Sequence, residues 1–187
     1  MNQTLIQLAT DLDARQIDYV VIGAVALNQH GYQRFTSDID ILLTPEGLQR
    51  FRAELVGRGY RPALEGATRK FRATVENVPI EIITSGEFPG DGRAKAVSFP
   101  DPPQVAAMID GVKTVSLEKL VELKLASGMT GLGRRRDLGD VQELIRALDL
   151  NSDFAAKIDE SVRALYLELW GELQAAREQT EAPDFKP

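Results

Sequence analysis

The chain has 187 residues, of which 43% are hydrophobic and 27% charged, with a formal net charge of -6, one histidine and no cysteine. These values suit one globular core with an extension, and they argue against disulfides, thiolate-held metals and broad binding to nucleic acid, which depends on many Lys and Arg side chains. No apolar run reaches the roughly 18 residues of a membrane span and the start is unlike a signal peptide, so we expect a cytoplasmic protein with no membrane partner, in which carboxylates hold any metal.

The first half of the chain alternates helical and strand patterns. Apolar residues first recur at helical spacing, and β-branched residues then form a buried run that ends at Gly23. Thr44 and Pro45 have the form of a helix N-cap and first helical residue. The predicted elements are a helix over residues 2–15, a strand over 17–22, a helix over 24–29, a strand over 37–43 and a helix over 45–56.

The second half begins with a predicted hairpin and ends in helices. Strands over residues 71–75 and 79–83 are separated by a connection of hairpin length. Gly and Pro residues predict a long loop or weak edge strand over residues 85–103, and Ser116 has the form of a helix N-cap. The predicted helices cover residues 117–128, 137–148 and 153–178, and residues 181–187 form a frayed end. The whole pattern predicts an α+β fold that ends in a helical region.

Acidic residues on two strands are the main chemical signal. Asp38 and Asp40 are two residues apart, so a strand turns both carboxylates to one face. Ile39 and Ile41 then enter a core on the other face, and Glu81 on a second strand can supply a third carboxylate. Such acids repel one another unless a cation neutralises them, and Mg²⁺ accepts carboxylate, water and phosphate oxygens. The alternative is that the acids are the polar face of a half-exposed strand.

A glycine turn precedes the two aspartates. Gly23 and Ala24 lie between a buried strand and a helix, where small residues let backbone N–H groups approach a phosphate. Taken alone, the pair is equally typical of a plain strand-to-helix turn. Its combination with Asp38 and Asp40 downstream favours a phosphate site.

Residues 20–43 resemble the signature of the nucleotidyltransferase superfamily. In that signature a hydrophobic strand ends in Gly-Gly or Gly-Ser and leads through a short helix to an Asp-x-Asp strand. Residues 31–40 look most like the AbiEii-type branch, a group that includes the toxins of type IV toxin-antitoxin systems. The helix that carries Lys124 and the Arg-Asp-x-x-Asp pattern at residues 136–140 are similar to that branch as well.

The resemblance implies a fold and a role for each matching residue. The expected fold is a mixed β-sheet flanked by helices, with residues 1–115 as the catalytic core and residues 116–187 as a helical region packed on it. Asp38 and Asp40 match the metal-binding aspartates, and Glu81 stands where the third carboxylate is usually an aspartate. The residues that match the nucleotide site are Gly23, Ala24, Ser37, Lys124 and Asp137. Ala24 replaces the second Gly or Ser of the family.

The implied activity is transfer of a nucleoside monophosphate from a nucleoside triphosphate to an acceptor hydroxyl, with Mg²⁺ or Mn²⁺ as cofactor. The acceptor is an RNA end such as that of tRNA, a protein side chain or a small molecule, and the sequence leaves these open. The resemblance to toxins also implies a cognate antitoxin as a partner. The competing interpretation is a relative without catalysis that binds a nucleotide or a partner protein, and Ala24 and Glu81 favour it.

Overall fold

The computed structural model describes residues 2–181; of the predicted frayed end at residues 181–187, Glu181 is the last residue of a helix and residues 182–187 lie outside the described residues. Its helices are α1 (Asn2–Ala14), α2 (Gly23–Gln29), α3 (Pro45–Glu54), α4 (Leu117–Gly128), α5 (Arg135–Ala147) and α6 (Glu160–Glu181). Its strands are β1 (Tyr19–Ile22), β2 (Ile39–Leu43), β3 (Tyr60–Pro62), β4 (Lys70–Ala73), β5 (Pro79–Thr84), β6 (Ala106–Ile109) and β7 (Val112–Val115). Short 3₁₀ helices cover Pro102–Gln104, Leu132–Arg134 and Ser152–Lys157. Every helix within residues 2–181 is too short or too polar to cross a lipid bilayer.

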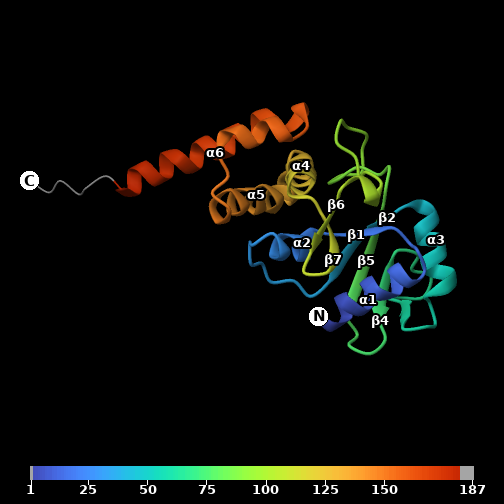
Figure 1. The fold of residues 1–187 in the computed structure, drawn as a ribbon. Coiled ribbons are helices and arrows are strands. Elements are labelled where there is room, and N and C mark those ends of the chain that lie inside the picture. The colour runs from blue at the N-terminus through green and yellow to red at the C-terminus, as the bar shows by residue number, and fades with distance from the viewer. Residues whose placement is uncertain (1, 182–187) are drawn as a thin grey trace, which may run out of the picture.

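The strands form one mixed sheet with helices on both faces. Its order is β3-β4-β5-β2-β1-β7-β6, in which β2 pairs parallel with β5 and β1 pairs parallel with β7. The other neighbouring strands are antiparallel. Helices α1 and α3 lie on one side of the sheet, and α4, α5 and α6 stack on the other (Figure 1). This arrangement confirms the predicted α+β class with a mixed sheet flanked by helices.

Alternate residues of the central strands belong to two separate hydrophobic cores, one on each face of the sheet. Val20 and Leu42 belong to the core beneath α4, α5 and α6, whereas Val21 and Ile41 belong to the core beneath α1 and α3. The strand period of two produces this division, because successive side chains point to opposite faces. Central strands buried on both faces therefore lack the polar alternation of a surface strand, and all of β1 is buried.

The hairpin β6–β7 and the strand β3 were not predicted. Asp110 and Gly111 connect β6 and β7 with φ values of 49° and 79°, which is the two-residue turn that Asp-Gly favours. That dipeptide was the available signal, because Met108, Ile109 and Val112 flank it. The elements are only three or four residues long, so periodicity alone is too weak to identify them.

The terminal helix begins later than the sequence predicts. Instead of one helix from residue 153, a 3₁₀ turn occupies Ser152–Lys157, Ile158 is extended, and α6 starts at Glu160. The Asp159 N–H donates to Glu122 Oε1 at 3.0 Å, and Asp159 Oδ1 accepts from the Ser161 N–H at 2.9 Å. Asp159 thus caps α6 while its backbone is tied to α4, which fixes the break.

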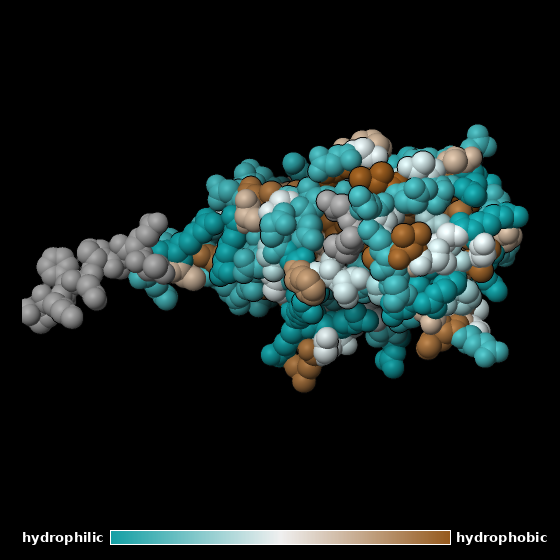
Figure 2. All heavy atoms as spheres, turned by 90° about the horizontal axis from the view of Figure 1, so that it is seen from below, coloured by the Kyte–Doolittle hydropathy of each residue, from teal (hydrophilic) through white to brown (hydrophobic). Residues whose placement is uncertain are grey.

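The outer surface is mainly polar on the face seen from below. Figure 2 shows hydrophilic side chains over most of this face, with apolar side chains scattered among them. The large exposed apolar side chains come from different parts of the chain, for example Leu64, Val75 and Met108. Such isolated exposed residues are normal for a globular protein.

Replacement of the α6 cap tests the observed helix start. Asp159→Ala should lower the free energy of unfolding by about 1 kcal/mol, because the Ser161 N–H loses its acceptor. Asp153→Ala, at the predicted start, should change it by less than about 0.5 kcal/mol. Urea unfolding followed by circular dichroism measures both. If Asp153→Ala were the more damaging variant, the helix would begin where the sequence predicts.

Candidate functional site

A cleft of about 500 Å³ opens between the sheet and the helices α4 and α5. The sheet contributes Asp40 and Glu81, and α4 contributes Lys124. The other polar lining residues are Lys70 on β4, Glu87 in the loop after β5, Ser127 on α4, Arg134 just before α5 and Asp137 on α5. The cleft therefore brings together residues from both halves of the chain.

Asp40 and Glu81 stand side by side because β2 and β5 pair in parallel. The register places Asp40 opposite Glu81 and Leu42 opposite Ile83. All four side chains share the sheet face beneath α4, since residues paired across parallel strands point the same way. The register therefore brings two of the three acids that were predicted to converge to one face, while Asp38 precedes β2.

The carboxylate of Asp40 lies in an environment that disfavours its charge. Burial, together with the nearby carboxylates of Asp38 and Glu81, raises the pKa of Asp40 to about 7. Lys124 and Arg34 oppose this rise without cancelling it. Glu81 has a partial partner in Lys70, whose Nζ lies 3.4 Å from Glu81 Oε2, but the Lys70 side chain is 66% exposed and that of Glu81 42%. The site thus holds more negative charge than the neighbouring cations balance.

Gly23 makes room for Asp40. It is the first residue of α2, it has a φ of +65°, and a Cβ added there would come within 3.0 Å of Asp40 Cγ. Only glycine combines this backbone conformation with so close an approach. Ala24 is buried in the same turn and is not among the residues that line the cleft. The sequence predicted Gly23 for phosphate contact, and the structure gives it a steric task as well.

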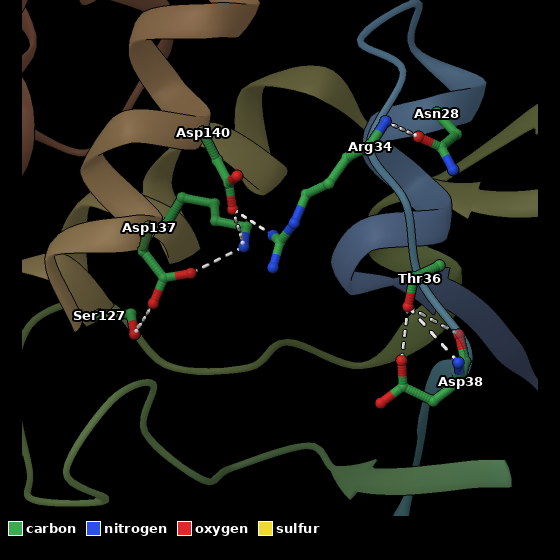
Figure 3. A network of polar contacts seen from close by, with 8 residues as sticks. Asn28, Arg34, Thr36, Asp38, Ser127, Asp137 and Asp140 are labelled. Carbon is green, nitrogen blue, oxygen red and sulfur yellow. Dashed lines mark hydrogen bonds and ion pairs between the residues drawn. The ribbon is translucent and has the colours of Figure 1, made fainter. Parts of the chain in front are cut away.

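Asp38 and Ser37 precede β2 instead of lying within it. Thr36 Oγ1 donates to Asp38 Oδ1 at 2.5 Å, so this carboxylate is held by its own loop (Figure 3). Ser37 is exposed, and neither residue lines the cleft. Within residues 2–181 no three Asp, Glu, His or Cys side chains already form a complete metal-ligand set.

The donor set nevertheless suits Mg²⁺ or Mn²⁺. Mg²⁺ uses one or two protein carboxylates and takes its other ligands from water and phosphate. Asp40 and Glu81 are adjacent, Asp38 is close enough to raise the pKa of Asp40, and their charge lacks a full set of cationic partners. A divalent cation relieves that repulsion. A role in metal binding for Asp38, Asp40 and Glu81 remains a prediction.

Lys124 belongs to a buried ion network on the helical side of the cleft. Its Nζ donates to Asp137 Oδ1 and to Asp140 Oδ2, both at 2.7 Å. Ser127 Oγ donates to Asp137 Oδ2 at 2.7 Å, and Arg34 Nη1 donates to Asp140 Oδ2 at 2.5 Å. Lys124 is 9% exposed and Asp140 only 3%. The cations and anions of this buried ion network are equal in number, so the excess negative charge lies with the acids on the sheet.

The buried ion network favours the charged form of Asp137. Burial opposes its charged form, but the Lys124 ammonium and the Ser127 hydroxyl outweigh burial and hold the pKa of Asp137 below its usual value. Asp137 and Lys124, both predicted to line the nucleotide site, do line the cleft. Their nucleotide contacts stay a prediction.

Sequence reasoning missed Arg34 as a member of this site and gave Asp140 no role of its own. Arg34 lies in loop 30–38, and its partner Asp140 on α5 is 106 residues further along the chain. The only sequence signal was the position of Asp140 one helical turn after Asp137, which places both on the same face of a helix.

Comparisons with known proteins show the fold. No protein-family model and no curated protein sequence matches the chain. The crystal structure of ANT(2″)-Ia in complex with adenylyl-2″-tobramycin is similar with a TM-score of 0.56 and 15% identity, over 91% of this chain and 99% of that one. An antigenic nucleotidyltransferase-like protein from Paracoccidioides brasiliensis has a TM-score of 0.55 and 18% identity, over 95% and 88% of the two chains. The lincosamide antibiotic adenylyltransferase LnuA, lincomycin-bound, has a TM-score of 0.51 and 15% identity, over 77% and 96%.

These similarities establish a nucleotidyltransferase fold for the chain and confirm the fold implied by the sequence signature. The finer resemblance to the AbiEii-type branch stays a prediction. So does the division of the chain at residues 115 and 116, where β7 is followed directly by α4.

Gly23→Ala tests the steric task of the glycine. We expect it to lower the free energy of unfolding by about 2 kcal/mol or more, because Ala disfavours a positive φ and its Cβ displaces Asp40. Gly139→Ala on α5 is the matched control. No atom lies within 4 Å of a Cβ at Gly139, so this change should stabilise by about 0.5–1 kcal/mol. Chemical denaturation of both variants decides; equal effects at the two positions would exclude the proposed clash.

Asp40→Asn tests the charge repulsion through its pH dependence in metal-free buffer. A carboxyl whose pKa is raised in the folded protein makes folding less favourable as pH rises from about 4 to about 7. Asn lacks that charge, so the variant should match wild type near pH 4 and exceed it by about 1–3 kcal/mol at pH 8. Urea unfolding at several pH values measures the difference. The exposed Asp18→Asn should show no such trend, and a pH-independent gain for Asp40→Asn would contradict the assignment.

Proposed function

We propose that the chain is a nucleotidyltransferase that uses Mg²⁺ or Mn²⁺ and moves a nucleoside monophosphate from a nucleoside triphosphate to an acceptor hydroxyl. The observation that supports this most is the pairing of Asp40 and Glu81 on adjacent strands, in a cleft where their charge is incompletely balanced. Folds alone do not determine reactions, so the proposal depends on this site and not only on the fold.

Each part of the proposed reaction has a group in the cleft. Asp38, Asp40 and Glu81 would hold the metal, which when bound stabilises charge on the attacking and leaving oxygens. Lys70 and Arg134 line the cleft and are exposed, so they are available to the phosphates. The less exposed Lys124 contributes its charge from within the buried ion network.

The proposed chemistry is one substitution at the α-phosphorus. The acceptor oxygen bonds to that phosphorus, the bond to the bridging oxygen of the β-phosphate breaks, and pyrophosphate leaves. The proton of the acceptor hydroxyl passes to the Glu81 carboxylate, which lies beside Asp40 and is partly exposed to the cleft. The main chain at Gly23 faces the same cleft and would contact a phosphate.

A small polar molecule is the acceptor that the site supports best. A cleft of about 500 Å³ has the size of a small-molecule site, and the net charge of -6 disfavours a large RNA surface. Of the similar structures, that of ANT(2″)-Ia contains adenylyl-2″-tobramycin, and LnuA is a lincosamide antibiotic adenylyltransferase. An RNA end and a protein side chain stay the alternative acceptors, and a cognate antitoxin as partner rests on the AbiEii resemblance alone.

A second candidate is a nucleotide-binding module without catalysis. The observation in its favour is that Asp38 is held by Thr36 and that no complete metal-ligand set exists within residues 2–181. The two candidates differ in one measurable property, because only the enzyme consumes triphosphate in a metal-dependent way.

The test uses purified protein with each of the four α-labelled nucleoside triphosphates, Mg²⁺, and separate pools of small metabolites, RNA and proteins as acceptors. We expect label to enter the small-molecule pool. Glu81→Gln and Asp40→Asn should each lower the rate by about 100-fold or more, because they remove a base or a metal ligand at nearly constant volume. Asp18→Asn should retain full activity. Tight triphosphate binding by wild type without any pyrophosphate release would favour the non-catalytic module.

A further inference from the structure

Loop 30–38, which connects α2 to β2, is held mainly by side chains. No backbone–backbone hydrogen bond is made by residues 33–37 within the described part of the chain. The loop leads directly into Asp38 and Asp40, so any movement of the loop would displace these acids. Something other than backbone pairing must fix its course.

Arg34 supplies the long-range anchor of residues 33–37, while His30 at the start of the loop has its own long-range contact, between Nε2 and the Val115 carbonyl oxygen. The Arg34 guanidinium donates to Asp140 on α5, and its backbone N–H donates to Asn28 Oδ1 at 2.5 Å. Figure 3 shows Arg34 extending from the loop towards α5, with Thr36 and Asp38 following on the same segment. Phe35, between Arg34 and Thr36, is 91% exposed, so residues 33–37 are held by polar contacts, whereas Tyr32 at the start of the loop packs against the core beneath α4, α5 and α6.

Asp140 accepts hydrogen bonds both from the loop and from a residue that lines the cleft. The same Oδ2 atom accepts from Arg34 and from Lys124, and Asp140 is almost fully buried. Charge-assisted hydrogen bonds in a buried position are strong and directional, and removing one partner leaves a buried charge without compensation. One carboxylate therefore links the course of loop 30–38 to the position of the Lys124 ammonium.

We propose that Arg34 and Asp140 are positioning residues, which couple α5 to loop 30–38 and so hold Asp38 in place for the reaction. This inference rests on the proposed function, because Asp38 matters only if it serves the nucleotide site. Neither residue needs to touch the substrate, since Arg34 acts through the loop and Asp140 acts through Arg34. Errors of about 1 Å in the placement of a reacting group lower rates by about 100-fold.

The coupling can be measured without activity. Hydrogen exchange of the Arg34 and Asp38 amides, which donate to Asn28 Oδ1 and Thr36 Oγ1, should become faster in Arg34→Gln and in Asp140→Asn, while the amides of β1 remain protected. Arg34→Lys, which keeps the charge, should restore part of the protection. Arg146→Gln is the matched control, because it removes an arginine from α5 that forms an exposed ion pair with Glu143. It should leave exchange in the loop unchanged.

Turnover supplies the second readout. Arg34→Gln should lower kcat by about 10- to 100-fold and change KM for the triphosphate by less than about threefold, because the loop is displaced but the phosphate contacts remain. Adding Asp140→Asn to Arg34→Gln should lower the exchange protection of the loop no further than Asp140→Asn alone, since the two changes break one link. Arg146→Gln should turn over at the wild-type rate.

The outcomes separate the inference from the proposed function. Faster loop exchange with unchanged kcat in an active protein overturns the positioning role and leaves the function standing. If loop exchange is faster in the variants but the wild-type protein itself shows no turnover, the coupling is supported and the proposed function is wrong. Unchanged exchange in both Arg34→Gln and Asp140→Asn, with circular dichroism verifying that the variants are folded, overturns the coupling itself.

Discussion

The carboxylate of Asp40 is partly buried against Gly23, next to Glu81 and close to Asp38. Placing like charges so close together is unfavourable in the absence of a cation, and the raised pKa of Asp40 expresses that. Several features of the fold meet at this one group. The glycine at the start of α2 leaves space for it, the parallel pairing of β2 with β5 puts its neighbour beside it, and Lys124 brings a positive charge from the helical side.

The helical region is part of the site and not only a cover. Lys124, Asp137 and Asp140 come from α4 and α5, yet through Arg34 they reach the loop that precedes Asp38. Balanced charges within the buried ion network leave the acids on the sheet as the uncompensated group. A cleft with that distribution of charge favours a ligand that brings its own cation, as a nucleoside triphosphate bound to Mg²⁺ does.

The sequence predicted the long elements and the acids, for local reasons. The Thr44 cap, the helix that starts after Ser116 and the glycine after β1 have signals within a few residues. The strand period predicted only that acids on adjacent strands could share one face, and the register of β2 against β5, which places Asp40 beside Glu81, depends on a long-range pairing without a local signal. The partner of Arg34 lies 106 residues away, and no local pattern encodes such a pairing. The start of α6 was wrong for the same reason, since the Asp159 backbone bonds to Glu122 on another helix.

The order of the strands sets how the chain can assemble. The fully apolar strand β1 needs two neighbours, and the second of them, β7, is formed only by Val112–Val115. As the ribosome releases the chain, β1 therefore waits with one open edge while β2 and the strands that follow it are made. Open apolar edges invite pairing with other chains. Pairing β1 with β7 also closes a long loop, which makes it a slow step. Protein synthesis thus passes through a stage in which the acidic strands exist but the sheet is unfinished, because β1 still has one open edge.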